Sequence, residues 1–136
     1  MSRRRKRNPE TIIMEKAKDE LPRRFHPSIA LIYRINPGTG IPLGGSVPQK
    51  FAPEGWPDLF MLLRGHAIGL EAKTATGSPE SSQVDMHRKW TSAGTPYIFF
   101  TSTESAIRQI EAALPAEVTA PATETEIAAW RASLPN

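Results

Sequence analysis

Apolar and polar residues follow one another with two different periods along the chain, and each period predicts a different kind of element. Residues 9–21 carry apolar side chains at helical spacing, with Pro9 at the first helical position and Pro22 as the expected end. Residues 28–35 form a short apolar run of β-favouring side chains, which predicts a buried strand. Residues 36–55 are rich in proline and glycine, so we expect a long loop there.

Two further apolar runs, residues 57–63 and 67–73, predict a β-hairpin. They are separated by Arg64 and Gly65, and glycine readily adopts the positive φ that a two-residue hairpin turn requires. Strands joined by so short a turn pair antiparallel, and the length of the turn fixes the register of the whole hairpin.

After the hairpin the period becomes helical again. We expect a helix from Pro79 to about Ala93, with Ser78 as its N-terminal cap and Gly94 as its C-terminal stop. Residues 97–101 then form another apolar run of the length of a buried strand.

The last third of the chain predicts two helices. Residues 102–114 have a helical apolar stripe, and residues 115–122 are expected to be a linker. Thr123 and Glu126 match a capping box, which predicts a short final helix. The complete order of elements predicts an α/β domain in which a mixed sheet is flanked by helices.

Length and composition narrow the class of protein. The chain has 136 residues, which suit one domain, and 39% apolar and 23% charged residues are typical of soluble globular proteins. Because there is no cysteine, disulfides, thiol nucleophiles and thiolate zinc sites are excluded. The three histidines, His26, His66 and His87, lack the spacing of paired metal ligands on a helix. With no apolar run long enough for a membrane and no signal core, we expect a cytoplasmic protein.

Basic residues are concentrated near the N-terminus, where Arg3, Arg4, Arg5, Lys6 and Arg7 form an unbroken run. Such a run can bind nucleic acid, because cationic side chains release counterions from the phosphates. A solvated tail explains the same run equally well.

The hairpin register brings three charged residues together. Leu63 pairs with His66 across the turn, and counting back along both strands places Asp58 directly opposite Glu71. Lys73 follows Glu71 by two residues and therefore projects from the same face. Cβ atoms of opposite residues lie about 4.5–5.5 Å apart, so two carboxylates and one ammonium share a small patch.

This patch is suited to metal-assisted hydrolysis. Two neighbouring carboxylates repel one another unless a cation lies between them, and Mg²⁺ prefers oxygen ligands of this kind. A bound ion can activate water and stabilise charge on a phosphodiester, while Lys73 can neutralise developing charge. An ordinary charge cluster on a solvated sheet face has the same spacing. The stiff sequence at 55–57 before Asp58 and the apolar remainder of the hairpin favour a functional site over an ordinary charge cluster.

The same residues resemble a family of nucleases. The pair P-D at 57–58, followed by E-A-K at 71–73, reproduces the signature of the PD-(D/E)xK nuclease superfamily. The wider stretch 55–73, followed by residues 77–83, resembles the VRR-NUC family, whose stand-alone members occur in phages and bacteria. Gln83 matches the glutamine that this family carries on its next helix.

The resemblance implies a restriction-endonuclease-like core with a mixed β-sheet of about four strands, in residues 9–114. Residues 1–8 would be a basic, flexible N-terminal arm that binds nucleic acid. Residues 115–136, a linker and a short helix, match nothing in the family.

The resemblance also implies a site. Asp58 and Glu71, joined by the backbone carbonyl of Ala72, would hold Mg²⁺, for which Mn²⁺ is a substitute. Lys73 would assist the attacking water, and Gln83 would hold the water or the lysine in place by hydrogen bonds.

An acidic residue of the first helix completes the family pattern. Glu10 fits it best because Ile13 follows three residues later, and Glu15 is a possible substitute. Trp56, beside the patch, could stack on a base or a sugar, although tryptophans in such positions are more often part of a core.

The implied reaction is hydrolysis of DNA phosphodiester bonds by an endonuclease. Small stand-alone members resemble Holliday-junction resolvases and act as homodimers, because cutting two symmetric strands needs two sites. Branched DNA and a homodimer are therefore implied. Two alternatives stay open: a nicking or restriction-like endonuclease on plain duplex DNA, and a non-catalytic module that binds nucleic acid.

Overall fold

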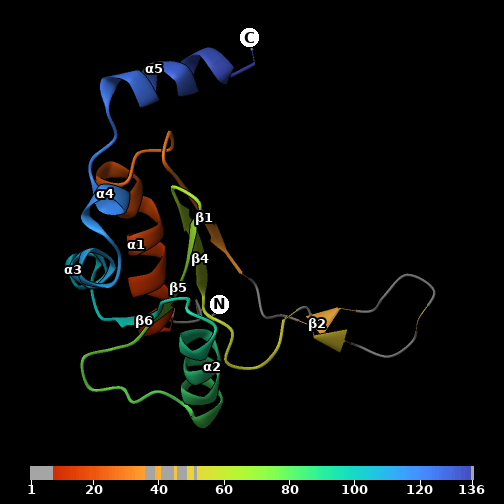
Figure 1. Ribbon diagram of the computed structural model, residues 1–136. Helices are drawn as coiled ribbons and strands as arrows, with labels where there is room; N and C mark the ends of the chain where they lie inside the picture. The colour runs from red at the N-terminus through yellow and green to blue at the C-terminus, as the bar shows by residue number, and fades with distance from the viewer. Residues whose placement is uncertain (1–7, 36–38, 41–44, 46–48, 51, 136) are drawn as a thin grey trace, which may run out of the picture.

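The computed structural model describes residues 8–35, 39–40, 45, 49–50 and 52–135. The helices are α1 (Pro9–Arg24), α2 (Ser81–Ser92), α3 (Thr103–Ala113), α4 (Ala116–Thr119) and α5 (Glu124–Ser133). The strands are β1 (Ala30–Arg34), β2 (Thr39–Gly40), β3 (Gln49–Lys50), β4 (Leu59–Leu63), β5 (His66–Ala72) and β6 (Tyr97–Phe100). Figure 1 shows the arrangement of these elements. The basic run Arg3–Arg7 lies outside the described residues.

The main sheet has four strands in the order β1-β4-β5-β6. The pairs β1–β4 and β4–β5 are antiparallel, whereas β5–β6 is parallel, so the sheet is mixed as predicted. A parallel pair needs a crossover connection, and α2 supplies it between β5 and β6. The predicted α/β fold, with a mixed four-stranded sheet and flanking helices, is confirmed.

The β4–β5 hairpin has the predicted register. Leu63 pairs with His66, and the regular ladder continues to the pair Leu59 and Leu70. The turn residues Arg64 and Gly65 have φ values of 44° and 83°, the two positive values that a type I′ turn requires. The strand ends opposite the turn therefore carry the residues that the register predicted to meet.

The two faces of the main sheet bury different kinds of side chain. One face packs on α1 and α3 and forms a continuous aliphatic and aromatic core. Its buried members include Met14, Leu21, Leu59, Met61, Leu63, Ile68, Leu70, Ala72, Phe100 and Ile110. The other face carries α2 and a separate, largely aromatic cluster. That cluster contains Met86, Trp90 and Tyr97, with Trp56, Phe60 and Phe99 packed against it.

The first helix is longer than the sequence predicted, because Pro22 does not end it. Helix α1 continues to Arg24, with Pro22 in its last turn. A proline so close to the C-terminal end removes only one helical hydrogen bond, and Phe25 N–H still donates to Leu21 O at 2.8 Å. Leu21 and Phe25 are both buried, which keeps this turn against the core.

The second helix begins later than predicted. Its N-cap is Glu80 and not Ser78, and the helix starts at Ser81. Glu80 N–H donates to Gln83 Oε1 at 2.9 Å, so the glutamine side chain caps the helix from inside its first turn. Gly94, with φ of 84°, follows the end of the helix as predicted.

Two segments predicted as irregular contain short elements. The long loop 36–55 includes β2 and β3, which pair antiparallel. The linker 115–122 includes α4, whose Val118 joins the core. Two arginines hold this segment: Arg24 donates to the carbonyl of Thr119, and Arg64 donates to carbonyls between Glu117 and Pro121.

The final helix is opened by the predicted capping box. Glu126 N–H donates to Thr123 Oγ1, and Thr123 N–H donates to Glu126 Oε1, both at 3.1 Å. Arg64 pairs with Glu126 at 2.8 Å, and this ion pair lowers the pKa of Glu126 to about 2. Beyond it, α5 extends away from the sheet, and it buries no residue (Figure 1). In the part of the chain that the structure describes, no helix is long and apolar enough to cross a membrane.

Candidate active site

Asp58 and Glu71 meet at the open end of the hairpin, one step beyond the last regular pair. Asp58 N–H donates to Glu71 Oε2 at 2.8 Å, and Ala72 N–H donates to Asp58 Oδ2 at 3.2 Å. Each carboxylate therefore binds the backbone of the opposite strand, where a continued ladder would have used backbone partners. The structure thus brings together the two carboxylates that the register placed opposite each other.

Lys73 lies at the same end of β5 with its side chain turned into the protein. Lys73 is 6% exposed and Glu71 is 4% exposed, which is unusual for charged residues. The Lys73 Nζ lies 3.7 Å from Glu10 Oε1, which comes from the first turn of α1. The first-helix acid Glu10 is therefore part of the same cluster.

Gln83 is held from both sides of its amide. Its Nε2 donates to Glu71 Oε1 at 2.6 Å, and its Oε1 accepts the Glu80 N–H that caps α2. These two bonds fix the orientation of the amide, with its NH₂ group toward the carboxylate. The sequence predicted that Gln83 would contact a water or Lys73, but here its partner is Glu71.

The loop before β4 is attached to α2 by contacts that the sequence did not reveal. Gly55 has φ of 82°, and a Cβ on it would lie 2.1 Å from Ser82 O, so only glycine lets the loop lie so close. Tyr97 Oη donates to Gly55 O at 2.8 Å. Together these contacts hold Trp56 and Asp58 beside the first turn of α2.

A cleft of about 410 Å³ opens on the carboxylates. Asp58 and Glu71 line it together with Glu54, Glu80 and Gln83. Four acidic residues thus line the cleft, and carboxylates that face one cleft attract cations.

Burial, and to a smaller extent the neighbouring Asp58 carboxylate, raise the pKa of Glu71 to about 8. Burial also raises the pKa of Asp58, although the Ala72 N–H and the positive charges of Lys73 and Arg34 act against it. Two acids whose pKa values are raised in one cleft indicate a site that a cation would stabilise.

The donor set fits a hard divalent ion. Asp58 and Glu71 supply four carboxylate oxygens. Three of them, Asp58 Oδ2 and both oxygens of Glu71, accept one hydrogen bond each here and can accept more. Magnesium typically takes one or two protein carboxylates and keeps several waters. Among the described residues, no group of three or more histidine, aspartate, glutamate or cysteine side chains is placed to hold a metal. Two carboxylates fit the ligand set that Mg²⁺ uses in proteins better than that of a closed structural metal site.

Trp56 belongs both to a core and to the cleft. Its ring packs edge-on against Trp90, with 5.0 Å between centroids, and it is half-buried in the aromatic cluster. It also lines the acidic cleft. The two roles considered for it from the sequence are therefore compatible.

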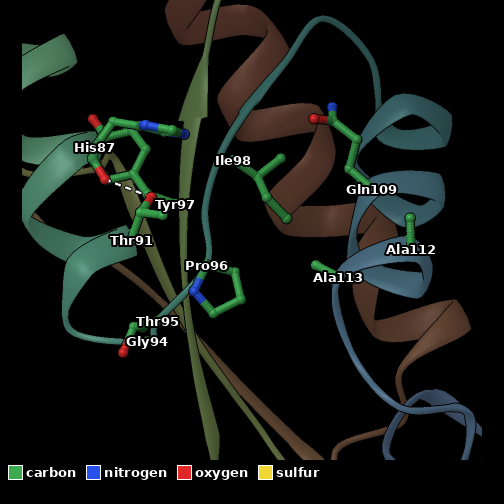
Figure 2. Close-up of a pocket in the computed structure, with 10 residues that line it drawn as sticks. All are labelled: His87, Thr91, Gly94, Thr95, Pro96, Tyr97, Ile98, Gln109, Ala112 and Ala113. Atoms are coloured by element: carbon green, nitrogen blue, oxygen red, sulfur yellow. Dashed lines mark hydrogen bonds between the residues drawn. The ribbon is translucent and has the colours of Figure 1, made fainter.

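A larger cavity, of about 580 Å³, lies elsewhere, between α2 and α3 (Figure 2). His87 and Thr91 face it from α2, and Gln109 and Ala112 face it from α3. It contains no carboxylate, and the His87 ring stacks on Phe99 with 5.6 Å between centroids. This cavity lacks the chemical groups that the acidic cleft supplies.

Comparison with solved structures gives a likeness in fold. No family model and no curated protein matches the chain. A solved structure described as a VRR_NUC domain does match, with a TM-score of 0.53 and 20% sequence identity. The match covers 77% of this chain and 97% of that one. At this level of identity the likeness concerns the fold, and it confirms the fold that the sequence resemblance implied.

Proposed function

We propose that the chain is a nuclease of the VRR-NUC family and hydrolyses DNA phosphodiester bonds with Mg²⁺, for which Mn²⁺ can substitute. Asp58 and Glu71, with the backbone carbonyl of Ala72, are the proposed metal ligands. The single observation that carries this proposal is the pair of carboxylates that share the cleft, with Lys73 buried beside them. The likeness in fold to a VRR_NUC domain supports it.

Bound Mg²⁺ would supply charge neutralisation at the phosphate and a more acidic water. The chain's own residues have separate tasks. Lys73 places its ammonium next to the carboxylates, where it can orient the attacking water and offset charge that develops on the phosphate. Glu10, 3.7 Å from the Lys73 Nζ, would hold the ammonium in position.

Gln83 is a positioning residue in this scheme. Through its bond to Glu71 Oε1 it fixes the rotamer of that carboxylate, so that the free lone pairs face the cleft. Trp56 lines the cleft and would cover part of it with an apolar ring.

Cleavage assays test this proposal. Supercoiled plasmid, linear duplex and a synthetic four-way junction are incubated with Mg²⁺ and with wild type, Asp58→Ala or Lys73→Ala. We expect cleavage by wild type and none by either variant, because each removes a group that acts on the phosphate or the metal. Cleavage that survives both substitutions would show that the hydrolytic site lies elsewhere.

The same gel separates the substrate classes. A structure-specific nuclease would cut the junction at two symmetric positions and leave linear duplex intact, and a homodimer would be expected for it. A nicking or restriction-like enzyme would cut plain duplex. Binding of all three substrates without cleavage, with any divalent ion, would indicate the non-catalytic binding module.

A further inference from the structure

The face of the sheet that carries the carboxylates also carries a row of aromatic side chains. Tyr33 pairs with Phe60, and Phe60 pairs with Gly69, so these three residues form one row across β1, β4 and β5. Asp58 and Glu71 follow two residues further along β4 and β5, on the same face. Two residues of a strand span roughly 7 Å, so the aromatic row lies one step from the carboxylates.

Trp90 and Trp56 extend this row, Trp90 from a buried position and Trp56 from a half-buried one. Trp90 lies directly over Gly69, where an added Cβ would be only 2.7 Å from its ring. Its ring centroid lies 5.0 Å from that of Trp56 and 6.4 Å from that of Phe60. We call Tyr33, Phe60, Trp90 and Trp56 the aromatic platform.

Part of this surface is open to solvent. Tyr33 is 61% exposed, and Leu31, next to it on the same face, is 47% exposed. None of the described residues covers these two side chains, since α2 packs toward the opposite edge of the sheet, over β6. A solvated antiparallel face normally carries polar side chains, so exposed apolar residues here indicate a binding surface.

The aromatic platform is continuous with the candidate active site. Beside the acidic cleft, Trp56 lines a second cavity, of about 390 Å³, together with Phe60, Met86, Lys89 and Trp90. Trp56 also lines the acidic cleft, so the two cavities share one wall. Trp56 is therefore the residue that links the aromatic platform to the acidic cleft.

The charges around the aromatic platform favour a nucleic acid over an apolar partner. Arg34 follows Tyr33 on β1 and lies close enough to Asp58 to lower its pKa. Lys89 lines the second cavity, and its ion pair with Asp85 is exposed at both ends, so a phosphate can replace the carboxylate at little cost. Aromatic rings flanked by cations are the features that bind single-stranded nucleic acid, because every base can stack.

We propose that the aromatic platform binds unpaired nucleotides of the substrate, whose bases stack on Tyr33 and neighbouring rings while the adjoining phosphodiester lies at Asp58 and Glu71. This inference rests on the proposed nuclease function and narrows it. The aromatic platform would therefore favour DNA whose bases are unpaired next to the cleaved bond.

Fluorescence anisotropy with labelled oligonucleotides tests this inference. An oligothymidine and a blunt duplex with the same number of phosphates are titrated with wild type, Tyr33→Leu and Tyr33→Phe, in EDTA to prevent cleavage. We expect Tyr33→Leu to weaken oligothymidine binding about tenfold, since one stacked base contributes about that factor. Duplex binding should change less than about twofold, and Tyr33→Phe, which keeps the ring, should bind like wild type. Phe60→Leu is a second variant that should act in the same direction.

Three outcomes would overturn the inference: no oligothymidine binding by wild type, equal losses on both ligands, or no effect of Tyr33→Leu and Phe60→Leu. Sedimentation of the same samples adds a fourth, because a wild-type dimer that Tyr33→Leu dissociates would identify this face as a contact between two copies.

Asp58→Ala separates the two proposals. It should bind oligothymidine but cleave nothing. If wild type does not cleave, the nuclease assignment fails, and if Asp58→Ala still cleaves, the proposed active site is wrong. If only the Tyr33 effects are missing, the nuclease assignment stands and the stacking surface does not.

Discussion

The two faces of the main sheet are built from the same strands but have opposite properties. On the face toward α1 and α3, Leu59, Met61, Leu63, Ile68 and Leu70 are fully buried. On the face toward α2, the alternate positions of the same strands carry carboxylates, aromatic rings and exposed apolar side chains. The first face therefore stabilises the fold, and the second face holds the groups that can do chemistry.

The difference between the two faces predicts which substitutions should change stability and which should change activity. Side chains alternate between faces along a strand, so neighbouring residues of β4 and β5 belong to different faces. Changes on the α1/α3 face should lower stability, and changes on the α2 face should lower activity while the protein stays folded. The following substitutions test this separation, beginning with the largest expected effect.

Lys73→Met should lower the cleavage rate by about 10²–10³, as loss of one charge-stabilising group commonly does. The ammonium of Lys73 is buried beside Glu71, so no other described lysine can replace it there. The matched control is Lys16→Met, which removes an exposed lysine that pairs with Glu20 on α1. Steady-state cleavage rates and circular dichroism of both variants give the comparison, and equal rates would contradict it.

Leu70→Ala should lower the free energy of unfolding by about 2–5 kcal/mol, because Leu70 is fully buried on the α1/α3 face. Leu31→Ala, on the open face, should change it by no more than about 0.5 kcal/mol, since much of its side chain is exposed. Urea denaturation of both variants measures the difference. A large loss for Leu31→Ala would mean that the open face is covered in solution.

Gln83→Ala should lower the Mg²⁺ affinity or the cleavage rate by about 10–100-fold, because it frees the carboxylate of Glu71 from its fixed rotamer. The rate should be partly recovered at high Mg²⁺ if positioning is the only function lost. Gln109→Ala is the control: Gln109 also donates its amide to a partner, the carbonyl of Phe99, but it lies away from the cleft. The comparison fails if the two variants have the same Mg²⁺ dependence.

Stability should depend on pH through Glu71. Its pKa of about 8 in the folded protein lies above the ordinary value of 4.5, so the folded state binds more protons than the unfolded state between these values. The free energy of unfolding should therefore fall as pH rises through this window, and Glu71→Gln should reduce the slope of this pH dependence.

Mg²⁺ favours the charged form of Glu71 and should raise Tm more at about pH 8 than at about pH 5. Thermal unfolding with and without EDTA measures both effects; a stability that rises with pH and a Glu71→Gln slope like wild type would contradict them.

The sequence predicted the hairpin and its register because two local signals agreed there. The turn residues Arg64 and Gly65 set the pairing, and the β-favouring runs on either side set the strands. The meeting of Asp58 and Glu71 then follows by counting. Gln83 was different, since only the resemblance to a nuclease family directed attention to it.

The sequence could not predict contacts made by the backbone of distant segments. Tyr97 donates to the carbonyl of Gly55, and Arg64 donates to carbonyls of 117–121; a carbonyl acceptor leaves no trace in residue type. The start of α2 was misjudged for a related reason. Ser78 and Glu80 can both cap a helix, and the choice of Glu80 depends on the side chain of Gln83. The pairing of Tyr33 with Phe60 likewise depends on the register between β1 and β4, two strands that no short turn connects.

The Mg²⁺ dependence of DNA cleavage by wild type and Asp58→Asn is the most direct test of the proposed metal-dependent active site. Asparagine keeps the size of the side chain and an oxygen that can accept the Ala72 N–H, but it removes the charge that would bind the ion. Initial rates of plasmid cleavage are measured against Mg²⁺ concentration and in EDTA. For wild type we predict no cleavage in EDTA and a rate that rises with Mg²⁺ to saturation, and for Asp58→Asn we predict almost none at any concentration. Wild-type cleavage that is as fast in EDTA as in Mg²⁺, or an Asp58→Asn rate equal to that of wild type, would contradict a metal-dependent site at Asp58.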